Sequence, residues 1–350
     1  MRSALKESRT NMTRHPAPRP LALVTVGLLI LGCAACTSAS GETVGSADHP
    51  GALAKNCGTG KKFKIGFAQA NNAEPYRQHV NSELKQLAKG YPDFDITIAD
   101  GRGDSNKQIS DVENFQTQQV DLLMISPFEA QPLTPTVSQL YAKGTPVIEL
   151  DRQTTGDKYT AFVGGDNQAI GKAAGTYTAQ KVLPNGGEVA ILEGLTSTTP
   201  AVQRTKGFTE GVAANPKIKV VAVQPADWLP DKAQTVFDAM LRANPGIKAV
   251  YANNDLMANG AYLALKGQNK VGDVAIIGTD GLPDEAGGDR AVIDGRMTAT
   301  FVYPTGAKEA LDLAKSILVD CAKSVERNTV VDTTLITKDN AQAAIDKARN

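Results

Sequence analysis

The strongest constraint on the fold is a regular alternation between short β-rich runs and longer segments of helical period. In the first half of the chain, strands are predicted at residues 63–68, 96–99, 122–125 and 147–150. Helices with one apolar face are predicted between them, at residues 76–89, 105–118 and 133–143. Successive parallel strands need a helix-length connection, so this order predicts right-handed βαβ units in a parallel sheet.

The second half of the chain repeats this scheme. Strands are predicted at residues 189–192, 219–223, 249–252, 274–277 and 298–302, and helices at 200–214, 230–243 and 255–266. The runs 122–125 and 147–150 are mostly apolar rather than alternating, which is typical of strands covered on both faces. Two similar halves predict an α/β chain with two lobes, in which a ligand would bind outside the carboxyl ends of the strands.

The first residues of the chain are typical of an export signal. Arginines precede an uncharged apolar run at 21–31, and at about 11 residues this run is too short to span a membrane. A small residue and Cys33 follow directly, in a pattern that resembles a bacterial lipobox. We therefore predict a signal peptide at 1–32, a lipid on Cys33 or alternatively on Cys36, and a lipid-anchored location outside the cytoplasmic membrane. A plain signal peptide and an N-terminal anchor helix are the alternatives.

Residues 33–60 are predicted to form a tether between the lipid and the folded domain. From residue 37 to about residue 54 the chain is rich in Ser, Gly, Ala and Thr and shows no hydrophobic period. Such a composition is typical of flexible linkers.

Charge and histidine content argue against several functional classes. The chain has 37 Lys and Arg residues and 37 Asp and Glu residues, whereas nucleic-acid-binding domains carry an excess of positive charge. The histidines, His15, His49 and His79, are scattered, and the cysteines outside the leader, Cys57 and Cys321, are too far apart for a CxxC motif. We therefore expect no nucleic-acid partner, no metal and no cofactor. Without a nucleophile elbow or a phosphate loop, an exported enzyme is the weaker interpretation.

Polar side chains with planar hydrogen-bonding groups follow the predicted strands, and aromatic residues accompany them. Sugar hydroxyls both donate and accept hydrogen bonds, and the C–H faces of sugars stack on aromatic rings. The residues in these positions are Tyr76, Arg77, Asp151, Arg152, Arg204, Trp228, Asn254 and Asp280. This mixture predicts a cleft that binds a small sugar or polyol.

Four motifs in these positions resemble one known family. They are residues 147–152 (VIELDR), 204–208 (RTKGF), 251–257 (YANNDLM) and 277–284 (IGTDGLPD). In this order and spacing they resemble the periplasmic sugar-binding proteins of the ribose, galactose and galactofuranose type, which feed ABC importers. The resemblance covers residues 63–337. It implies the type I periplasmic binding protein fold, in which two Rossmann-like lobes with parallel sheets are joined by a hinge of three crossings.

The resemblance also implies roles for individual residues. Asp151 and Arg152 match an Asp-Arg pair that bonds sugar hydroxyls, and Arg204, Asn254 and Asp280 match polar residues of the cleft. Trp228 matches a stacking aromatic, with packing in the core as the alternative, and Tyr76 matches the aromatic of the first lobe. Arg77 departs from the ribose-type pattern and looks like the galactofuranose type. Tyr303 stands near a position that is polar in relatives, and it is counted as the ninth predicted ligand-binding residue.

Other polar residues near these positions are not assigned to the ligand-binding set. Asp255 is expected to be the N-cap of the following helix rather than a ligand-binding residue. Asn71, Asn72 and Glu74 are either ligand-binding residues or residues of an exposed loop, and the sequence leaves both interpretations open.

The resemblance predicts the lobe boundaries. Crossings are expected near Gly165, Tyr303 and Asn328. The first lobe then comprises residues 61–165 and 304–327, and the second lobe comprises residues 166–303 and 328–350.

The resemblance also bears on the cysteines that lie outside the leader. Cys57 and Cys321 form an even pair in an exported chain, which is compatible with a disulfide or with two partly buried thiols. A helix is predicted at residues 307–321 in the first lobe, running away from the cleft. Cys57 precedes the first strand at that same end, so a bond between the two cysteines is predicted.

The predicted function is capture of a hexose, pentose or related polyol by a monomeric receptor, followed by delivery to the permease of an ABC importer. The main alternative is a sensory receptor that reports ligand to a membrane partner. The ligand-binding half of a repressor is a further alternative, but such a repressor would carry a helix-turn-helix where this chain has a leader.

Overall fold

A computed structural model describes residues 42–45, 53–54 and 56–349. The predicted signal peptide and both candidate lipidation sites, Cys33 and Cys36, lie outside the described residues. Within them, no helix combines the length and the apolar character needed to cross a membrane.

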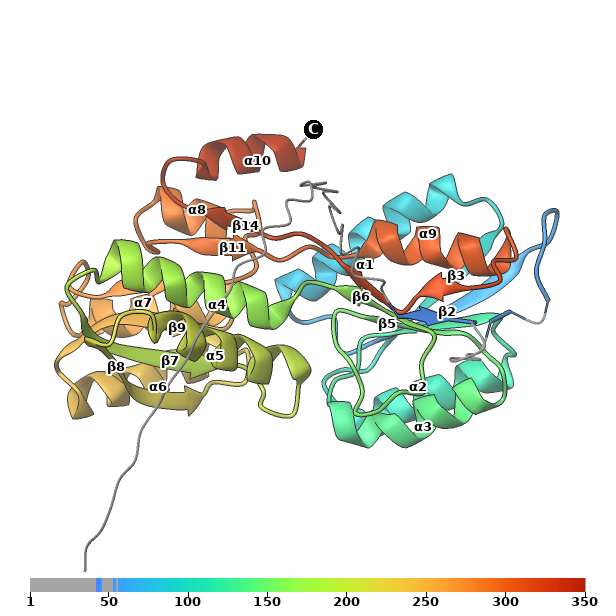
Figure 1. Cartoon of the computed structure of the whole chain (residues 1–350), viewed down its shortest axis with the longest axis horizontal. Helices are drawn as coiled ribbons and strands as arrows, with labels where there is room; N and C mark the ends of the chain where they lie inside the picture. Colours follow the sequence, from blue (N-terminus) through green and yellow to red (C-terminus); the bar gives the residue numbers. More distant parts are fainter. Residues whose placement is uncertain (1–41, 46–52, 55, 350) are drawn as a thin grey trace, which may run out of the picture. The chain divides into compact units, whose positions relative to one another are not determined.

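The first lobe is built on a parallel sheet of six strands in the order β13-β6-β5-β4-β2-β3. The strands are β2 (Phe63–Gln69), β3 (Phe94–Asp100), β4 (Leu122–Ile125), β5 (Val147–Leu150), β6 (Ala161–Gly164) and β13 (Asn328–Val330). The helices are α1 (Pro75–Leu87), α2 (Ser105–Thr117), α3 (Ala130–Ala142) and α9 (Ala307–Leu318), and the short 3₁₀ turn η1 (Ala88–Gly90) follows α1. Figure 1 shows α1 and α9 on one face of this sheet and α2 and α3 on the other. Because both faces are covered, β4 and β5 are buried along their whole length.

The second lobe has a parallel sheet of four strands in the order β10-β9-β7-β8. The strands are β7 (Gly187–Glu193), β8 (Ile218–Pro225), β9 (Ile247–Ala252) and β10 (Ala275–Ile277). The helices are α4 (Asn167–Tyr177), α5 (Thr199–Val212), α6 (Pro230–Ala243), α7 (Asp255–Gly267), α8 (Gly288–Ile293) and α10 (Ala341–Arg349), and the π-helical turn η2 (Thr178–Val182) extends α4. A separate antiparallel ladder joins β11 (Thr300–Val302) to β14 (Thr334–Ile336).

Glycines bring α4 and α5 unusually close together. A Cβ atom at Gly171 of α4 would lie 2.2 Å from the carbonyl oxygen of Arg204. In return, a Cβ at Gly207 of α5 would lie 2.0 Å from the carbonyl oxygen of Gln168. Any larger residue would push the two helices apart, so this contact sets where α5 holds Arg204.

Three segments connect the lobes: residues 165–166, 303–306 and 331–333. The third crossing corrects the predicted boundary at Asn328. Residues Asn328–Val330 pair with β6 in the sheet of the first lobe, and the chain reaches the second lobe only at β14. The prediction missed this strand because it lies at the edge of the sheet, is three residues long and has no apolar pattern.

Cys57 and Cys321 form a disulfide in the structure, with 5.4 Å between their Cα atoms. Beside it, the amide of Gly58 donates a hydrogen bond to the carbonyl oxygen of Leu318 at the end of α9. The bond therefore joins the segment before β2 to the end of α9.

The predicted tether is not featureless. β1 (Thr43–Val44) lies within it and pairs antiparallel with β12 (Val325–Glu326). Val44 is fully buried in the core of the first lobe, which explains why the chain is held at this point. A two-residue strand with a single apolar side chain gives no periodic signal, so the composition alone suggested a linker throughout.

Candidate functional site

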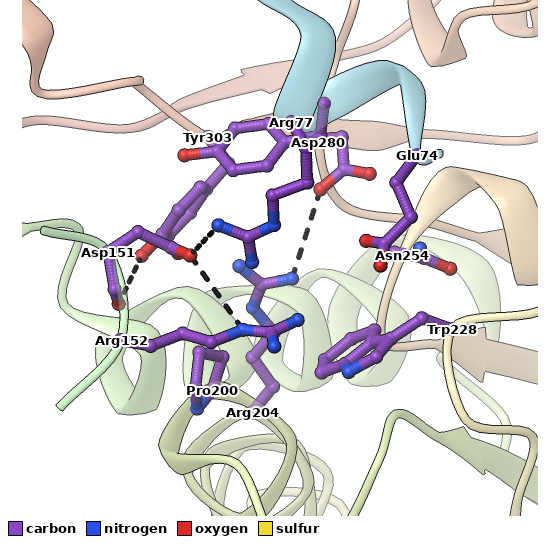
Figure 2. Close-up of a pocket in the computed structure, with 11 residues that line it drawn as sticks. Glu74, Arg77, Asp151, Arg152, Pro200, Arg204, Trp228, Asn254, Asp280 and Tyr303 are labelled. Atoms are coloured by element: carbon purple, nitrogen blue, oxygen red, sulfur yellow. Dashed lines mark hydrogen bonds and ion pairs between the residues drawn. The ribbon is translucent and has the colours of Figure 1, made fainter. Parts of the chain in front are cut away.

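A small cavity is lined by residues from both lobes. Its lining consists of Glu74, Tyr76, Arg77, Asp151, Arg152, Pro200, Arg204, Trp228, Asn254, Asp280 and Tyr303 (Figure 2). The structure thus brings together the nine residues that the sequence analysis named as ligand-binding. Glu74 and Pro200 are additions to that set.

The convergence follows from the parallel sheets. Asp151 and Arg152 follow β5, Asn254 follows β9, and Asp280 lies beyond β10, so each stands at the carboxyl end of a strand. Tyr76 and Arg77 lie in the first turn of α1, after β2. Arg204 comes from α5 and Trp228 from the connection between β8 and α6.

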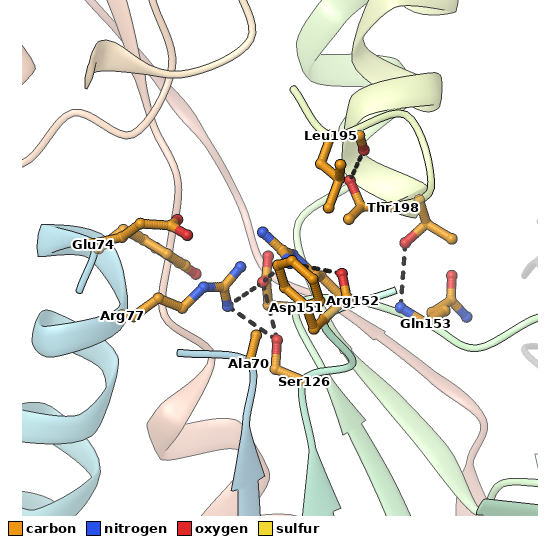
Figure 3. A network of polar contacts seen from close by, with 12 residues as sticks. Ala70, Glu74, Arg77, Ser126, Asp151, Arg152, Gln153, Leu195 and Thr198 are labelled. Carbon is orange, nitrogen blue, oxygen red and sulfur yellow. Dashed lines mark hydrogen bonds and ion pairs between the residues drawn. The ribbon is translucent and has the colours of Figure 1, made fainter. Parts of the chain in front are cut away.

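A buried ion pair joins α1 to the end of β5. Arg77 Nη1 lies 2.6 Å from Asp151 Oδ2, and both side chains are at most 4% exposed. The Ser126 hydroxyl accepts a hydrogen bond from Arg77 and donates one to Asp151 (Figure 3). Burial works to raise the pKa of Asp151, but the guanidiniums of Arg77 and Arg152 outweigh it and leave that pKa below its ordinary value.

Arg152 is the least compensated of the three guanidiniums in the cavity. Its Nε lies 3.9 Å from Asp151 Oδ2, and Nη1 donates a hydrogen bond to the carbonyl oxygen of Phe128. Its Cζ lies 5.6 Å from the ring centroid of Trp228. Burial, together with the positive charge of Arg77, lowers the pKa of Arg152 to about 10. A ligand that accepts hydrogen bonds here would offset the cost of burying this charge.

Arg204 connects the second lobe to the hinge. Its Nε donates to Asn167 Oδ1 at 2.8 Å, and its Nη1 donates to the carbonyl oxygen of Asn253 at 2.6 Å. The guanidinium also stands 4.4 Å from the ring centroid of Tyr303, which lies in the second crossing. The Tyr303 hydroxyl in turn accepts a hydrogen bond from Asn167.

Several donors of the cavity residues have no hydrogen-bond partner among the described residues. They are Arg77 Nε, Arg152 Nε and Trp228 Nε1, and all three atoms are buried. A buried donor without a partner costs about 1–3 kcal/mol, so native proteins rarely keep one without a reason. Three such donors around one cavity indicate a site for a ligand rich in oxygen acceptors.

Three cavity residues also have backbone conformations that side chains rarely adopt. Asp151 and Trp228 have φ of 68°, and Asp280 has φ of 147°. Residues in these regions cost about 1–3 kcal/mol each and occur mainly at functional sites. The surrounding fold therefore holds these side chains in position at some cost to stability.

The position of Trp228 depends on a glycine at the end of β7. A Cβ at Gly194 would lie 2.1 Å from Cζ2 of the indole. Replacing Gly194 with alanine should therefore displace the indole, lower the free energy of unfolding by about 1–3 kcal/mol and shift the fluorescence of the chain's single tryptophan. Gly267→Ala is the matched control because a Cβ at Gly267 would meet nothing within 4 Å. Equal spectra for the two variants would contradict this prediction.

The structure corrects the assignment of the α7 N-cap. Asn254, not Asp255, is the N-cap residue, and its Oδ1 accepts a hydrogen bond from the amide of Met257 at 2.9 Å. Asp255 is the first helical residue, and its carboxylate points to other partners. Asn and Asp are almost equally good caps, so the adjacent pair could not be resolved from the sequence.

The loop before α1 contains Glu74, which lines the cavity and whose role the sequence left open. Asn71 is buried and its Nδ2 donates to Glu74 Oε1 at 2.6 Å, so it orients the Glu74 side chain. Asn72 is exposed, accepts a hydrogen bond from Asn81 and does not line the cavity. The Asn-x-x-Glu spacing, which places the two side chains together, was the available signal for Glu74.

Comparison with known proteins identifies the family. A family profile described as a periplasmic binding protein domain matches residues 65–320. The chain belongs to the periplasmic binding protein family. Among curated relatives in this family, the ribose import binding protein RbsB of Escherichia coli (strain K12) is 34% identical over 248 residues, which is 70% of this chain and 81% of that protein.

Solved structures of periplasmic binding proteins share the fold. The fructose binding periplasmic domain of a hybrid two component system superposes with a TM-score of 0.79 and 38% identity, covering 82% of this chain and 94% of that one. A protein from Mycobacterium smegmatis in complex with β-D-fucofuranose gives a TM-score of 0.76 and 29% identity, covering 82% of this chain and 95% of that one. The predicted family and the predicted two-lobed α/β fold with parallel sheets are confirmed.

Proposed function

We propose that this protein is an extracytoplasmic receptor that captures a hexose, a pentose or a related polyol between its lobes. The observation that carries the proposal is the buried cavity whose arginine and tryptophan donors have no partner among the described residues. A sugar supplies many oxygen acceptors and few charges, so it can pair these donors without adding a buried charge. The names of the relatives, which include ribose, fructose and fucofuranose binders, support the same class of ligand.

The site residues divide by chemistry. Arg77, Arg152 and Arg204 donate hydrogen bonds to sugar oxygens, and Asp151 orients two of these guanidiniums. Tyr76, Trp228 and Tyr303 contact the C–H faces of the ring. Glu74, Asn254 and Asp280 exchange hydrogen bonds with hydroxyls. A sugar lacking one hydroxyl would leave a buried group unpaired, which costs about 1–3 kcal/mol per group and sets specificity.

Binding is a non-catalytic event in this proposal. The ligand contacts both lobes, and the three crossings at 165–166, 303–306 and 331–333 act as the hinge about which the lobes close. A monomer suffices, because one chain supplies the whole lining of the cavity. A leader at 1–32 and a lipid on Cys33 would place the receptor at the outer face of the membrane.

The proposed partner is the permease of an ABC importer, which receives the sugar from the ligand-bound form. Similarity to the ribose import binding protein supports this partner. One observation favours a second candidate function, a sensory receptor, because the fructose binding relative is a domain of a hybrid two component system. Ligand-dependent stimulation of transporter ATP hydrolysis in proteoliposomes is expected for an importer partner and not for a sensor.

The proposal is tested by titrating the full chain, purified in detergent, with pentoses, hexoses and polyols. Because Trp228 is the single tryptophan and lines the cavity, its fluorescence should change on binding. A ligand at 100 times its Kd should add about 2.7 kcal/mol to the free energy of unfolding. Arg152→Ala should remove both signals. Absence of any change with every compound would reject the sugar-binding proposal.

Closure should also depend on hydrogen bonds at the rim of the cavity. The amide of Gln153 in the first lobe donates to Thr199 Oγ1 in the second, and the amide of Ala130 donates to the carbonyl oxygen of Ser197. Replacing Thr199 with valine keeps the shape but leaves the Gln153 amide unpaired. We expect ligand affinity to fall by about fivefold, which corresponds to about 1 kcal/mol.

The matched control for Thr199 is its exposed neighbour Thr196, replaced in the same way. Titration calorimetry with the best ligand from the screen measures both variants. Equal affinities for the two valine variants would show that the rim contact contributes nothing to closure.

A further inference from the structure

Asp255 is a buried carboxylate that does not line the cavity. It begins α7 and is 4% exposed. Its Oδ2 accepts a hydrogen bond from the amide of Gly281 at 2.8 Å, and its Oδ1 accepts one from the hydroxyl of Thr300 at 2.7 Å. One side chain therefore ties α7 to β11 and to the loop that carries Asp280.

Two glycines make the space that this carboxylate occupies. A Cβ at Gly278 would lie 2.1 Å from Asp255 Oδ1, and a Cβ at Gly288 would lie 2.0 Å from Oδ2. Either substitution would drive the carboxylate out of its position. The absence of a side chain at both glycines therefore leaves just enough space for the Asp255 carboxylate. A residue that only capped a helix would not need this space.

Asp280 is the cavity residue that directly precedes Gly281, whose amide is bonded to Asp255. Its amide donates to the carbonyl oxygen of Phe301, and its own carbonyl oxygen accepts from the amide of Tyr303. With φ of 147°, its backbone is held in a strained region, and the Asp255–Gly281 hydrogen bond fixes the next residue. Arg204 Nη1 stands 4.0 Å from Asp280 Oδ1, which is an ion pair at the limit of contact and no hydrogen bond.

The two carboxyl groups are electrostatically coupled. Burial raises the pKa of Asp280 well above its ordinary value, the negative charge of Asp255 raises it further, and Arg204 opposes both effects. Burial also raises the pKa of Asp255, to about 6, against the opposing hydrogen bonds from Thr300 and Gly281. Since two donors stabilise the ionised form of Asp255, Asp280 is the carboxyl group of the two that keeps its proton to higher pH.

Other charged and titratable groups surround this pair from each neighbouring element. Those acting on Asp255 or Asp280 are Glu74, Tyr76, Arg77, Arg204, Tyr251, Asp284 and Asp289. The cations among them are Arg77 and Arg204, and Arg77 is already paired with Asp151. The balance of charge around Asp280 therefore favours its neutral form.

We propose that Asp255 is a positioning residue for the candidate sugar site: it holds the Asp280 loop in place, and its charge makes Asp280 a hydrogen-bond donor to the ligand. The inference rests on the proposed sugar-binding function. A neutral carboxylic acid can donate a hydrogen bond to a sugar oxygen, whereas a carboxylate only accepts. Affinity is then fully present below the pKa of Asp280 and declines as pH rises through it.

The test compares Asp255→Asn with the unmodified full chain in detergent. Asparagine keeps the size of the side chain and an oxygen acceptor but removes the charge, so Asp280 should lose its proton at lower pH. Calorimetric titration with the best sugar from the screen, between about pH 5 and 9 and so above the ordinary aspartate pKa of about 3.9, gives the pH profile of Kd. We expect the inflection to move down by about one pH unit or more.

The matched control is Asp273→Asn, an exposed aspartate shortly before β10, which should leave the inflection unchanged. Asp280→Asn, whose amide donates at every pH, should give a flat profile. If Asp255→Asn fails to fold, Thr300→Val is the second variant. It removes one donor from Asp255, moves the proton toward that residue, and should lower the inflection in the same direction.

A measurement without ligand separates this inference from the proposed function. Infrared spectra of the unmodified chain near neutral pH should contain a carboxylic-acid band that is absent from Asp280→Asn. As pH is raised, Asp255→Asn should lose this band at a lower pH than the unmodified chain does. If no sugar binds but this band behaves as expected, the proposed function fails and the effect of Asp255 on the protonation of Asp280 stands. If sugar binds and Asp255→Asn leaves both the inflection and the band unchanged, the inference is overturned.

Discussion

Replacing Asp151 with asparagine should lower the free energy of unfolding by about 3–5 kcal/mol and abolish ligand binding. Its carboxylate pairs with Arg77 at 2.6 Å and lies 3.9 Å from the guanidinium of Arg152. Without the negative charge, two buried guanidiniums repel each other and one loses its partner. Urea-induced unfolding measures the stability, and titration with the best ligand of the screen measures the binding.

The pH dependence of this effect has a definite sign. The pKa of Asp151 is lowered in the folded state, so its contribution is present above the unfolded value of about 3.9 and is lost as pH falls through the folded value. The difference between Asp151→Asn and the unmodified chain should therefore be constant at neutral pH and shrink only in acid. A difference that grew as pH fell would contradict this assignment.

The matched control for Asp151 is Asp157, an aspartate whose side chain is 74% exposed in the following loop. Asp157→Asn should change stability by no more than about 0.5 kcal/mol. A double variant, Asp151→Asn with Arg77→Met, should recover part of the loss because it removes one of the uncompensated charges. If the double variant were less stable by the sum of both single effects, the charge pair would not be the cause.

The cavity lining was predictable because it depends on two simple rules. Apolar runs such as 122–125 and 147–150 place the strands, and parallel sheets gather the residues that follow each strand. Asp151, Asn254 and Asp280 could therefore be named without any knowledge of distances. The interactions among them could not, since the 2.6 Å contact between Arg77 and Asp151 depends on how α1 sits on the sheet.

Some of the elements that escaped prediction have sequences that are poor helix or strand formers. α4 contains Gly171 and Gly175, which disfavour an isolated helix, and it is stable here because α5 packs closely against it. β13 is a short edge strand, and neither β6 nor α4 was predicted from the sequence. In each case a partner distant in the sequence supplies the stabilising contact.

Replacing Cys57 and Cys321 together with serine should lower the free energy of unfolding by about 2–5 kcal/mol. The bond closes a loop between residues that are 264 positions apart, so its loss frees much of the unfolded chain. It also releases the segment before β2 from the end of α9, where the amide of Gly58 now pairs with Leu318. Urea-induced unfolding with and without dithiothreitol measures the effect: the reductant should weaken the unmodified chain and leave the serine variant unchanged.

Ligand affinity should respond differently from stability in this variant. Cys57 lies before β2 and Cys321 beyond the end of α9, whereas the cavity lies past the carboxyl ends of β2 and β5. The serine variant should therefore bind the best sugar with an unchanged Kd while unfolding at a lower urea concentration. If the Kd rose in parallel with the loss of stability, the disulfide would be holding the first lobe in its binding conformation. The prediction that the disulfide stabilises the lobe without affecting the cavity would then be wrong. An unchanged Kd would mean that the first lobe keeps its half of the cavity through its own parallel sheet and the Arg77–Asp151 pair.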